Sequence, residues 1–169
     1  MDSRNIIDTP IDLIMTSMSE DTQKKPALEQ ILDEWDADAK WDPSDPGTAM
    51  ARIPILHAKY LRYLRRHKAT VRILENQITK ERHLKTEYYS GRLDQEQLKK
   101  YGLVPFKFVI KQEVKEYVDS DDKVMELNLK KSAHEQVVEL CESIMKELNN
   151  RTWQLSGYMK WQQFLRGQD

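Results

Sequence analysis

Cationic side chains are concentrated in one stretch, residues 52–92, which holds eleven Lys or Arg and three acidic residues. The stretch therefore has a formal charge of +8 in a chain whose total is −1. Two aromatic residues, Tyr88 and Tyr89, stand near its end beside Lys85 and Arg92. Cations that contact phosphates and rings that stack on bases are the groups that single-stranded nucleic acid requires. The stretch is therefore a candidate binding site for this polyanion.

The candidate nucleic-acid-binding residues within this stretch are all cationic or aromatic. They are Lys59, Arg62, Arg65, Arg66, Lys68, Arg72, Lys80, Arg82, Lys85, Tyr88, Tyr89 and Arg92. Two other interpretations stay open: a surface that docks an acidic protein or a membrane surface, and a solvated helix with tyrosines packed at its end. Binding to a polyanion predicts a steep salt dependence, because each phosphate contact releases counterions.

Residue patterns that support catalysis are not found in the sequence. There is no glycine-rich phosphate loop, and the four histidines show no metal-ligand spacing with Cys141 or with each other. Ser90 lies in a Tyr-Ser-Gly turn and not in a nucleophile elbow. The acidic cluster at 119–122 lacks the glycine and the distal glutamate of a calcium loop. We therefore expect no catalytic residues, no metal and no cofactor, and a protein that is not an enzyme.

A long helix is predicted to present the basic stretch. No Gly or Pro falls between Pro54 and Gly91, and apolar residues recur at alternating spacings of three and four. These residues are Leu56, Tyr60, Leu64, His67, Val71, Leu74 and Ile78. Asp45 and Pro46 are typical of an N-cap and a first helical residue, and Gly91 of a helix end. The pattern predicts a packed seam, with His67 as a core histidine, and a basic face on the opposite side.

A second long helix is predicted from Asp122 to Leu165, where an apolar seam returns and no proline interrupts. The seam comprises Met125, Leu129, Val137, Leu140, Cys141, Ile144, Leu148, Leu155, Tyr158 and Leu165. Its apolar positions exceed what one partner face needs, so we interpret this helix as the assembly element. The residues assigned to oligomerisation are Val137, Leu140, Ile144, Leu148, Leu155 and Tyr158, with Trp153, Trp161 and Phe164 in packing or subunit contacts.

The shorter segments are also predicted to be helical, which makes the fold class mainly α. Residues 26–40 and 93–100 have the pattern of short helices. Residues 103–110, LVPFKFVI, are compatible with a short strand or a helix. The helical spacing of the apolar residues here favours a helix over 105–118. We expect the long basic helix to pack antiparallel against the long C-terminal helix.

Charge and composition divide the chain into three regions. Residues 1–51 carry twelve Asp or Glu against four Lys or Arg. We predict a flexible acidic arm over 1–25, a helical nucleic-acid-binding region over 26–92, for which the family resemblance described below implies single-stranded DNA, and a helical oligomerisation region over 93–169. The acidic segment covers the basic face when nucleic acid is absent, contacts a basic partner, or only aids solubility. The sequence shows no signal peptide and no long apolar run, which predicts no membrane contact, and one cysteine suits a reducing cytoplasm.

The run from His83 to Arg92, HLKTEYYSGR, resembles the signature of the UvsY family, the recombination mediators of large myovirus phages. In that signature a basic pair, two residues apart, precedes an acidic residue and Tyr-Tyr-Ser-Gly. The resemblance covers roughly residues 26–169. It includes the preceding basic helix, a polar turn followed by a helix with a lone cysteine, and the C-terminal run RTWQLSGYMKWQQFLRG.

The resemblance implies a non-enzymatic protein that binds single-stranded DNA in the cytoplasm of an infected bacterial host. It implies a ring-like homo-oligomer of six or seven subunits, which contacts a RecA-like recombinase and a single-stranded-DNA-binding protein and helps the first replace the second on DNA. On the family pattern, the basic pair that binds DNA falls at His83 and Lys85. His83 departs from the pattern because it is not a fixed cation at neutral pH, and Arg82 is placed to supply the charge.

The alternative is a coiled-coil scaffold whose basic helix docks an acidic protein. An exposed ring pair at Tyr88 and Tyr89 distinguishes the two, because stacking residues favour nucleic acid and a protein dock does not need them.

Overall fold

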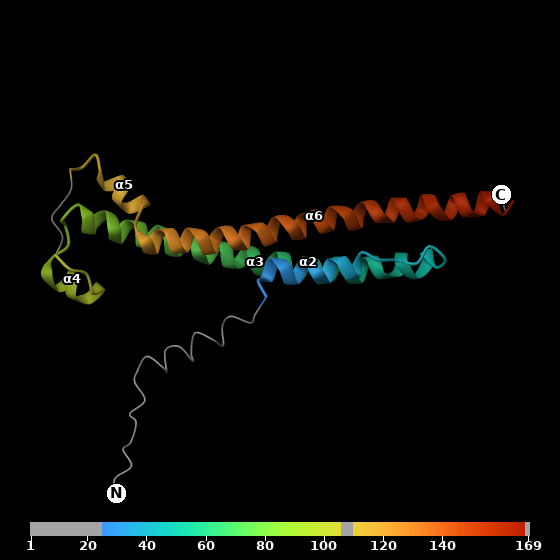
Figure 1. The fold of residues 1–169 in the computed structure, drawn as a ribbon, viewed down its shortest axis with the longest axis horizontal. Coiled ribbons are helices and arrows are strands. Elements are labelled where there is room, and N and C mark those ends of the chain that lie inside the picture. The colour runs from blue at the N-terminus through green and yellow to red at the C-terminus, as the bar shows by residue number, and fades with distance from the viewer. Residues whose placement is uncertain (1–24, 106–109, 168–169) are drawn as a thin grey trace, which may run out of the picture.

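The computed structural model describes residues 25–105 and 110–167, and it consists of helices and their connections over these ranges. The predictions for residues 1–24 and 106–109 lie outside these ranges. The helices are α2 (Ala27–Asp38), α3 (Pro46–Tyr89), α4 (Gln95–Tyr101), α5 (Val114–Asp119) and α6 (Asp122–Leu165). The 44-residue helices α3 and α6 run antiparallel, and α2 lies alongside them (Figure 1). The mainly α fold class is confirmed.

Local capping groups set the ends of the longest helices close to where the sequence predicts them. The Asp45 side chain accepts a hydrogen bond of 3.1 Å from the Thr48 backbone N–H, with Pro46 as the first helical residue. Gly91, with φ of 67°, follows the last turn of α3. Asp121 accepts from the backbone N–H groups of the first turn of α6. The two aspartate N-caps satisfy N–H groups that have no partner inside the helix.

The short helix α4 is bounded in the same way. Asp94 and Gln97 form a reciprocal capping box, with hydrogen bonds of 2.7 Å and 3.0 Å. Gly102 ends the helix in the left-handed conformation, with φ of 65°, which costs glycine little because it has no Cβ. Tyr101 is therefore fixed as the last residue of α4.

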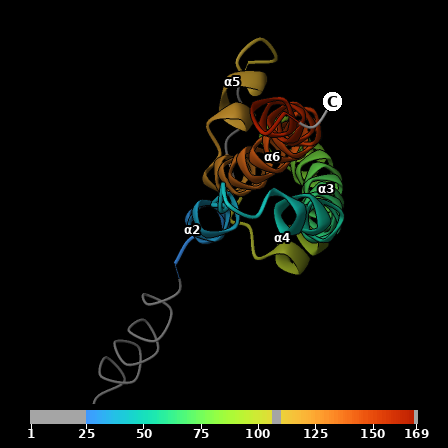
Figure 2. The ribbon, with the colours of Figure 1, turned by 90° about the vertical axis from the view of Figure 1, so that its right-hand side faces the viewer.

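The main core lies where α2, α3 and α6 meet, at the corners of a triangle when viewed along the long axis (Figure 2). It contains Ile31 from α2, Leu56, Tyr60 and Leu64 from α3, and Val137, Cys141, Ile144 and Leu148 from α6. The predicted α3 seam is confirmed, with Val71 half-buried and the other six residues buried. Burial raises the pKa of the Cys141 thiol to about 11, as expected for a small apolar core residue.

The predicted seam of α6 is wrong at Met125, Leu129 and Leu165, whose side chains are 54%, 74% and 61% exposed. Val124 is buried in the first turn instead. The buried side of the helix continues from Val124 through polar residues such as His134, and a search for apolar spacing alone assigns a different phase there. Polar residues face α3 in this part because partners on α3 satisfy them.

The predicted helix over 105–118 is also wrong among its described residues before Val114: Pro105 and residues 110–113 are not helical, and α5 begins at Val114. Residues 111–113 form a turn closed by a 2.8 Å hydrogen bond from the Glu113 N–H to the Ile110 carbonyl. The single turn and a half of α5 is stabilised by Val114 and Val118, which are buried against the hairpin. In Figures 1 and 2, α4 and α5 flank the same end of the hairpin on opposite sides.

None of the helices in the described ranges combines the length and apolar character that crossing a membrane requires.

Candidate nucleic-acid interface

An exposed basic face runs along α3 on the side opposite its buried seam. It consists of Arg62, Arg65, Arg66, Arg72 and Lys80, all of which are exposed. Within the described ranges, none of these five side chains forms an ion pair. Five like charges over 19 residues, about 27 Å of helix, produce a positive potential that attracts a polyanion. We call these five residues the α3 basic face.

The cations before this face are paired with acidic residues of α2. The Lys59 ammonium lies 2.8 Å from both the Glu34 and the Asp38 carboxylates, and Arg52 lies 3.4 Å from Asp38. The hydrogen bond from Lys59 holds the pKa of Glu34 below its usual value. Part of the acidic segment therefore neutralises Arg52 and Lys59 at the start of the basic stretch, and coverage of the α3 basic face by this segment stays a prediction.

The cations after this face are also paired, and one of them is half-buried. Arg82 lies 2.6 Å from Asp119, and Lys85 lies 2.9 Å from Asp121 with only 13% of its side chain exposed. Burial alone would raise the pKa of Asp121, but hydrogen bonds from Lys85 and Tyr89 outweigh it and hold that pKa below its usual value. Arg82 and Lys85 thus stabilise the junction of α3 with α5 and α6 in this structure. Their assignment to DNA stays a prediction.

The remaining cations of the predicted site are exposed. Lys68 pairs with Glu142 at 2.7 Å and Arg92 with Glu87 at 3.1 Å, and each cation keeps half or more of its side chain in solvent. Exposed pairs of this kind contribute about 0–1 kcal/mol, so an incoming phosphate can replace the carboxylate. The His83 side chain is exposed at the same end of α3.

The tyrosine pair is not the exposed platform that the sequence predicted. The Tyr88 hydroxyl donates to the Val104 carbonyl at 2.8 Å, and the Tyr89 hydroxyl donates to Asp121 at 3.0 Å. Both side chains are half-buried, and burial together with Asp121 raises the pKa of Tyr89 to about 12. The two rings lie 5.1 Å apart, and Tyr89 also contacts Tyr117. These contacts anchor the chain after α3 to the hairpin.

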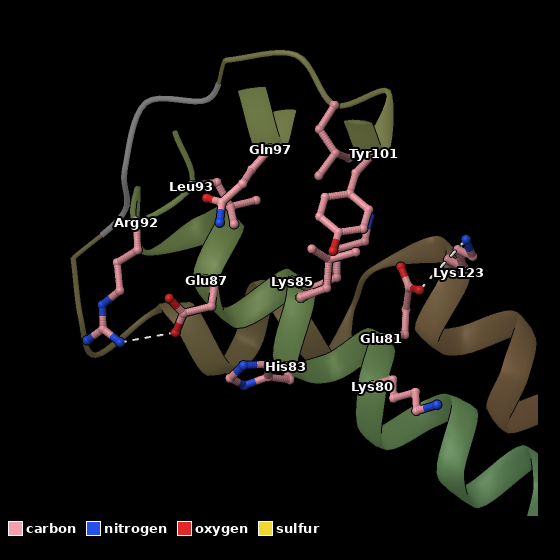
Figure 3. A pocket seen from close by; sticks show the side chains of 12 residues that line it. Lys80, Glu81, His83, Lys85, Glu87, Arg92, Leu93, Gln97, Tyr101 and Lys123 are labelled. Carbon is pink, nitrogen blue, oxygen red and sulfur yellow. Dashed lines mark hydrogen bonds and ion pairs between the residues drawn. The ribbon is translucent and has the colours of Figure 1, made fainter. Parts of the chain in front are cut away.

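A groove of about 1060 Å³ lies between the end of α3 and α4 (Figure 3). Cations line it, among them Lys80, Arg92 and Lys123, and the Tyr101 side chain points from α4 towards α3. Tyr101 is 48% exposed and does not belong to the predicted site, and neither does Lys123. The capping box and Gly102 predict that Tyr101 ends a helix, but only the folding back of α4 places it beside α3.

Two histidines meet inside the hairpin. Nδ1 of His67 lies 2.8 Å from Nδ1 of His134, so one ring donates and the other accepts. Burial, followed by the nearby His134 and Arg66, lowers the pKa of His67. This agrees with the prediction of a satisfied core histidine. In the described part of the chain, no three His, Cys, Asp or Glu residues are grouped as metal ligands.

The side chains assigned to oligomerisation are mostly buried by other helices of the same subunit. Val137, Ile144, Leu148 and Leu155 are buried, and Leu140 and Tyr158 are half-buried. The Tyr158 hydroxyl donates to the Pro43 carbonyl at 3.1 Å, and its ring meets Trp41 edge to face. Their role between subunits stays a prediction. Near the C-terminal end of α6, the large apolar side chains of Trp153, Trp161, Phe164 and Leu165 are between 56% and 81% exposed.

Comparison with known proteins identifies a matching family model and a solved structure with a similar fold. Residues 34–168 match the model of a family described as "Recombination, repair and ssDNA binding protein UvsY". A crystal structure of the bacteriophage T4 recombination mediator protein UvsY superposes with a TM-score of 0.73 at 19% sequence identity, over 82% of this chain and 97% of that one. No curated protein sequence matches the chain. At this level of identity, the structural likeness supports the fold.

Proposed function

This chain belongs to the UvsY family, and from that membership we propose that it is a recombination mediator that binds single-stranded DNA along the α3 basic face. The observation that carries the proposal is the unpaired charge of that face. The cations on either side of it are occupied by carboxylates of the same chain, whereas Arg62, Arg65, Arg66, Arg72 and Lys80 have no such partner among the described residues.

The proposed site is a track and not a pocket with base-specific contacts. Arginines one turn apart contact phosphates, and the exposed apolar side chains of Ile55 and Ile73 on the same side of α3 can contact bases or sugars. Such a surface binds with little sequence preference. Each phosphate contact adds about 0.7 to the negative slope of log K against log salt, so five contacts predict a slope of about −3.5 per subunit.

In the mediator proposal, the protein acts as a ring-like homo-oligomer of six or seven subunits in the cytoplasm of an infected bacterium. One strand then engages several copies of the α3 basic face, and contacts that are weak individually add through their effective concentration. The exposed apolar residues near the end of α6 support the proposal that this end joins the subunits. In this proposal, region 26–92 binds DNA and region 93–169 joins the subunits, although the two regions pack together as one α3–α6 hairpin.

The bound strand is proposed to be handed to a RecA-like recombinase in place of a single-stranded-DNA-binding protein. No covalent step is involved, because the protein need only stabilise a DNA geometry that the recombinase accepts. This protein and the single-stranded-DNA-binding protein compete for the strand, and this competition removes the single-stranded-DNA-binding protein from it.

The proposal is tested by fluorescence anisotropy of a labelled single-stranded oligonucleotide across a salt series, with a duplex of equal length as the control. We expect tight, salt-steep binding that prefers the single strand, and faster recombinase filament assembly on DNA covered by single-stranded-DNA-binding protein. Absence of binding at low salt would refute the proposal. Binding to an acidic protein, with no preference for the single strand over duplex, would favour the scaffold.

A further inference from the structure

The groove between α3 and α4 continues the α3 basic face. Lys80 belongs to both: it is the last residue of the face and lines the groove. A strand that follows the face towards the end of α3 therefore reaches the groove without crossing an acidic surface on α3. With a volume of about 1060 Å³, the groove is slightly larger than the roughly 300–1,000 Å³ of typical ligand-binding pockets.

The charges that line the groove favour an anion. Of the four cations that line it, Lys85 is paired with Asp121, whereas Lys80, Arg92 and Lys123 stand against two acidic residues, Glu81 and Glu87. Both acids already have a partner: Glu87 lies 3.1 Å from Arg92 and Glu81 lies 3.7 Å from Lys123. The Arg92 and Lys123 side chains are 62% and 64% exposed, so these pairs are solvated and a phosphate can compete for either cation.

The groove also supplies an accessible ring. Tyr101 is 48% exposed and points from α4 towards the α3 side chains (Figure 3). The Lys100 ammonium lies 5.5 Å from the centre of the Tyr101 ring. Tyr88 and Tyr89, by contrast, are half-buried and their hydroxyls are bonded within the chain. A ring bordered by cations is the arrangement on which single-stranded bases stack.

We propose that this groove is a nucleotide-binding site in which Tyr101 stacks on a base of single-stranded DNA while Lys80 and Arg92 contact the flanking phosphates. This inference rests on the proposed function, because it concerns the same strand. It assigns stacking to a residue of α4 and leaves the tyrosine pair at the end of α3 with a structural role.

The test separates the base from the backbone. Full-length protein is titrated with a thymidine oligonucleotide and with an abasic oligonucleotide of the same length, for the wild type, Tyr101→Ala and Tyr101→Phe. We expect Tyr101→Ala to weaken binding of the thymidine strand about tenfold, with an unchanged salt slope, and to leave the abasic strand unaffected. Tyr101→Phe should bind as the wild type does, because the ring is retained.

A second pair of variants tests the phosphate contacts. Lys80→Gln should reduce the salt slope by about 0.7, whereas the matched control Lys99→Gln, an exposed lysine of α4 that does not line the groove, should leave it unchanged. Circular dichroism checks that each variant is folded. Cross-linking of the wild type to a 5-bromouracil oligonucleotide, mapped by mass spectrometry, gives an answer even if a variant fails to fold.

The outcomes distinguish this inference from the function on which it rests. Equal affinity of Tyr101→Ala and wild type for the thymidine strand, or cross-links that avoid Tyr101, would overturn the groove as a nucleotide site while wild-type binding upholds the mediator. Failure of the wild type to bind any single strand at low salt would overturn both.

Discussion

The α3–α6 hairpin is packed differently in its two halves. In the half that contains Tyr60 and Leu148, α2 adds a third helix, and both of these side chains are fully buried in the main core, with the Tyr60 hydroxyl donating to Asp38 at 3.0 Å. In the other half, α3 from His67 onwards meets the start of α6 through buried Leu74, Ile78 and Val124 and through polar contacts. The polar contacts are the His67–His134 pair, a 3.3 Å ion pair of Glu75 with Lys131, and the Lys85–Asp121 pair. We call these the three-helix half and the polar half.

We infer from this difference that the three-helix half provides most of the stability and that the polar half provides the groove. Apolar burial is non-directional and increases with area, so the three-helix half is expected to contribute most of the free energy of unfolding. The polar half depends on specific geometry, and it contains Lys80, the groove and α4. Regions of lower local stability are where binding surfaces adapt to their ligands. The α3 basic face crosses both halves, with Arg62, Arg65 and Arg66 in or next to the first.

The largest expected effect tests the packing of the three-helix half. Leu148→Ala should lower the free energy of unfolding by about 4 kcal/mol, because a fully buried leucine leaves a cavity between three helices. Leu74→Ala, in the polar half, should cost about 2 kcal/mol because its neighbours can relax into the space. Urea unfolding at constant protein concentration measures both, with the exposed Leu129→Ala as a control within about 0.5 kcal/mol of wild type. Equal costs for Leu148 and Leu74 would remove the distinction between the halves.

The next effect concerns the ion pair that closes the polar half. Asp121→Ala removes both the cap of α6 and the partner of Lys85, and should cost about 3 kcal/mol. Asp121→Asn keeps a capping oxygen and should cost less. Since the pKa of Asp121 is held low in the folded protein, its contribution is fully present above about pH 4 and is lost as pH falls through the folded pKa. Urea unfolding at pH 7 and pH 3 should therefore show the wild type and Asp121→Asn converging in acid, and a constant difference would contradict this.

A third effect compares unpaired with paired cations. Arg62→Ala combined with Arg66→Ala should weaken single-strand binding at least tenfold and reduce the salt slope by about 1.4, because two phosphate contacts are lost. Lys59→Ala should leave the slope unchanged, because its ammonium is already held by Glu34 and Asp38. The control is Lys146→Ala with Lys160→Ala, two exposed residues of α6. A slope change in Lys59→Ala as large as in the arginine variant would place the DNA on the α2 side.

The smallest effect is a pH dependence that belongs to the polar half. Because the pKa of His67 is lowered on folding, the unfolded chain binds more protons between its pKa of about 6.5 and the folded value. Stability should therefore be greatest above about pH 6.5 and decrease as pH falls towards 5.5. His67→Leu should reduce this dependence, and the exposed His83→Gln should leave it unchanged. The slope of the unfolding free energy with pH measures both variants, and an unaltered slope in His67→Leu would exclude the histidine pair as its source.

The sequence by itself determined the two long helices and the helix ends that carry a capping residue, but not the start of α5. The caps at Asp45, Asp94 and Asp121 and the glycines at 91 and 102 act on the backbone within one turn, so their consequences do not depend on the rest of the fold. The α3 seam was also predictable, because apolar residues that recur without interruption at helical spacing can all lie on only one side of the helix. The excess of positive charge on α3 also follows from composition alone.

Only the tertiary structure decided which of these residues are available to a ligand. Charge along the sequence does not distinguish Arg62 from Lys59 or Lys85, because the carboxylates that pair with the two lysines lie more than 20 residues away in the chain. Likewise, Tyr88 and Tyr89 are half-buried because α5 and the start of α6 fold against the end of α3. Tyr101 reaches the groove because α4 folds back. Ion pairing and burial are properties of contacts between distant segments, and no local pattern records them.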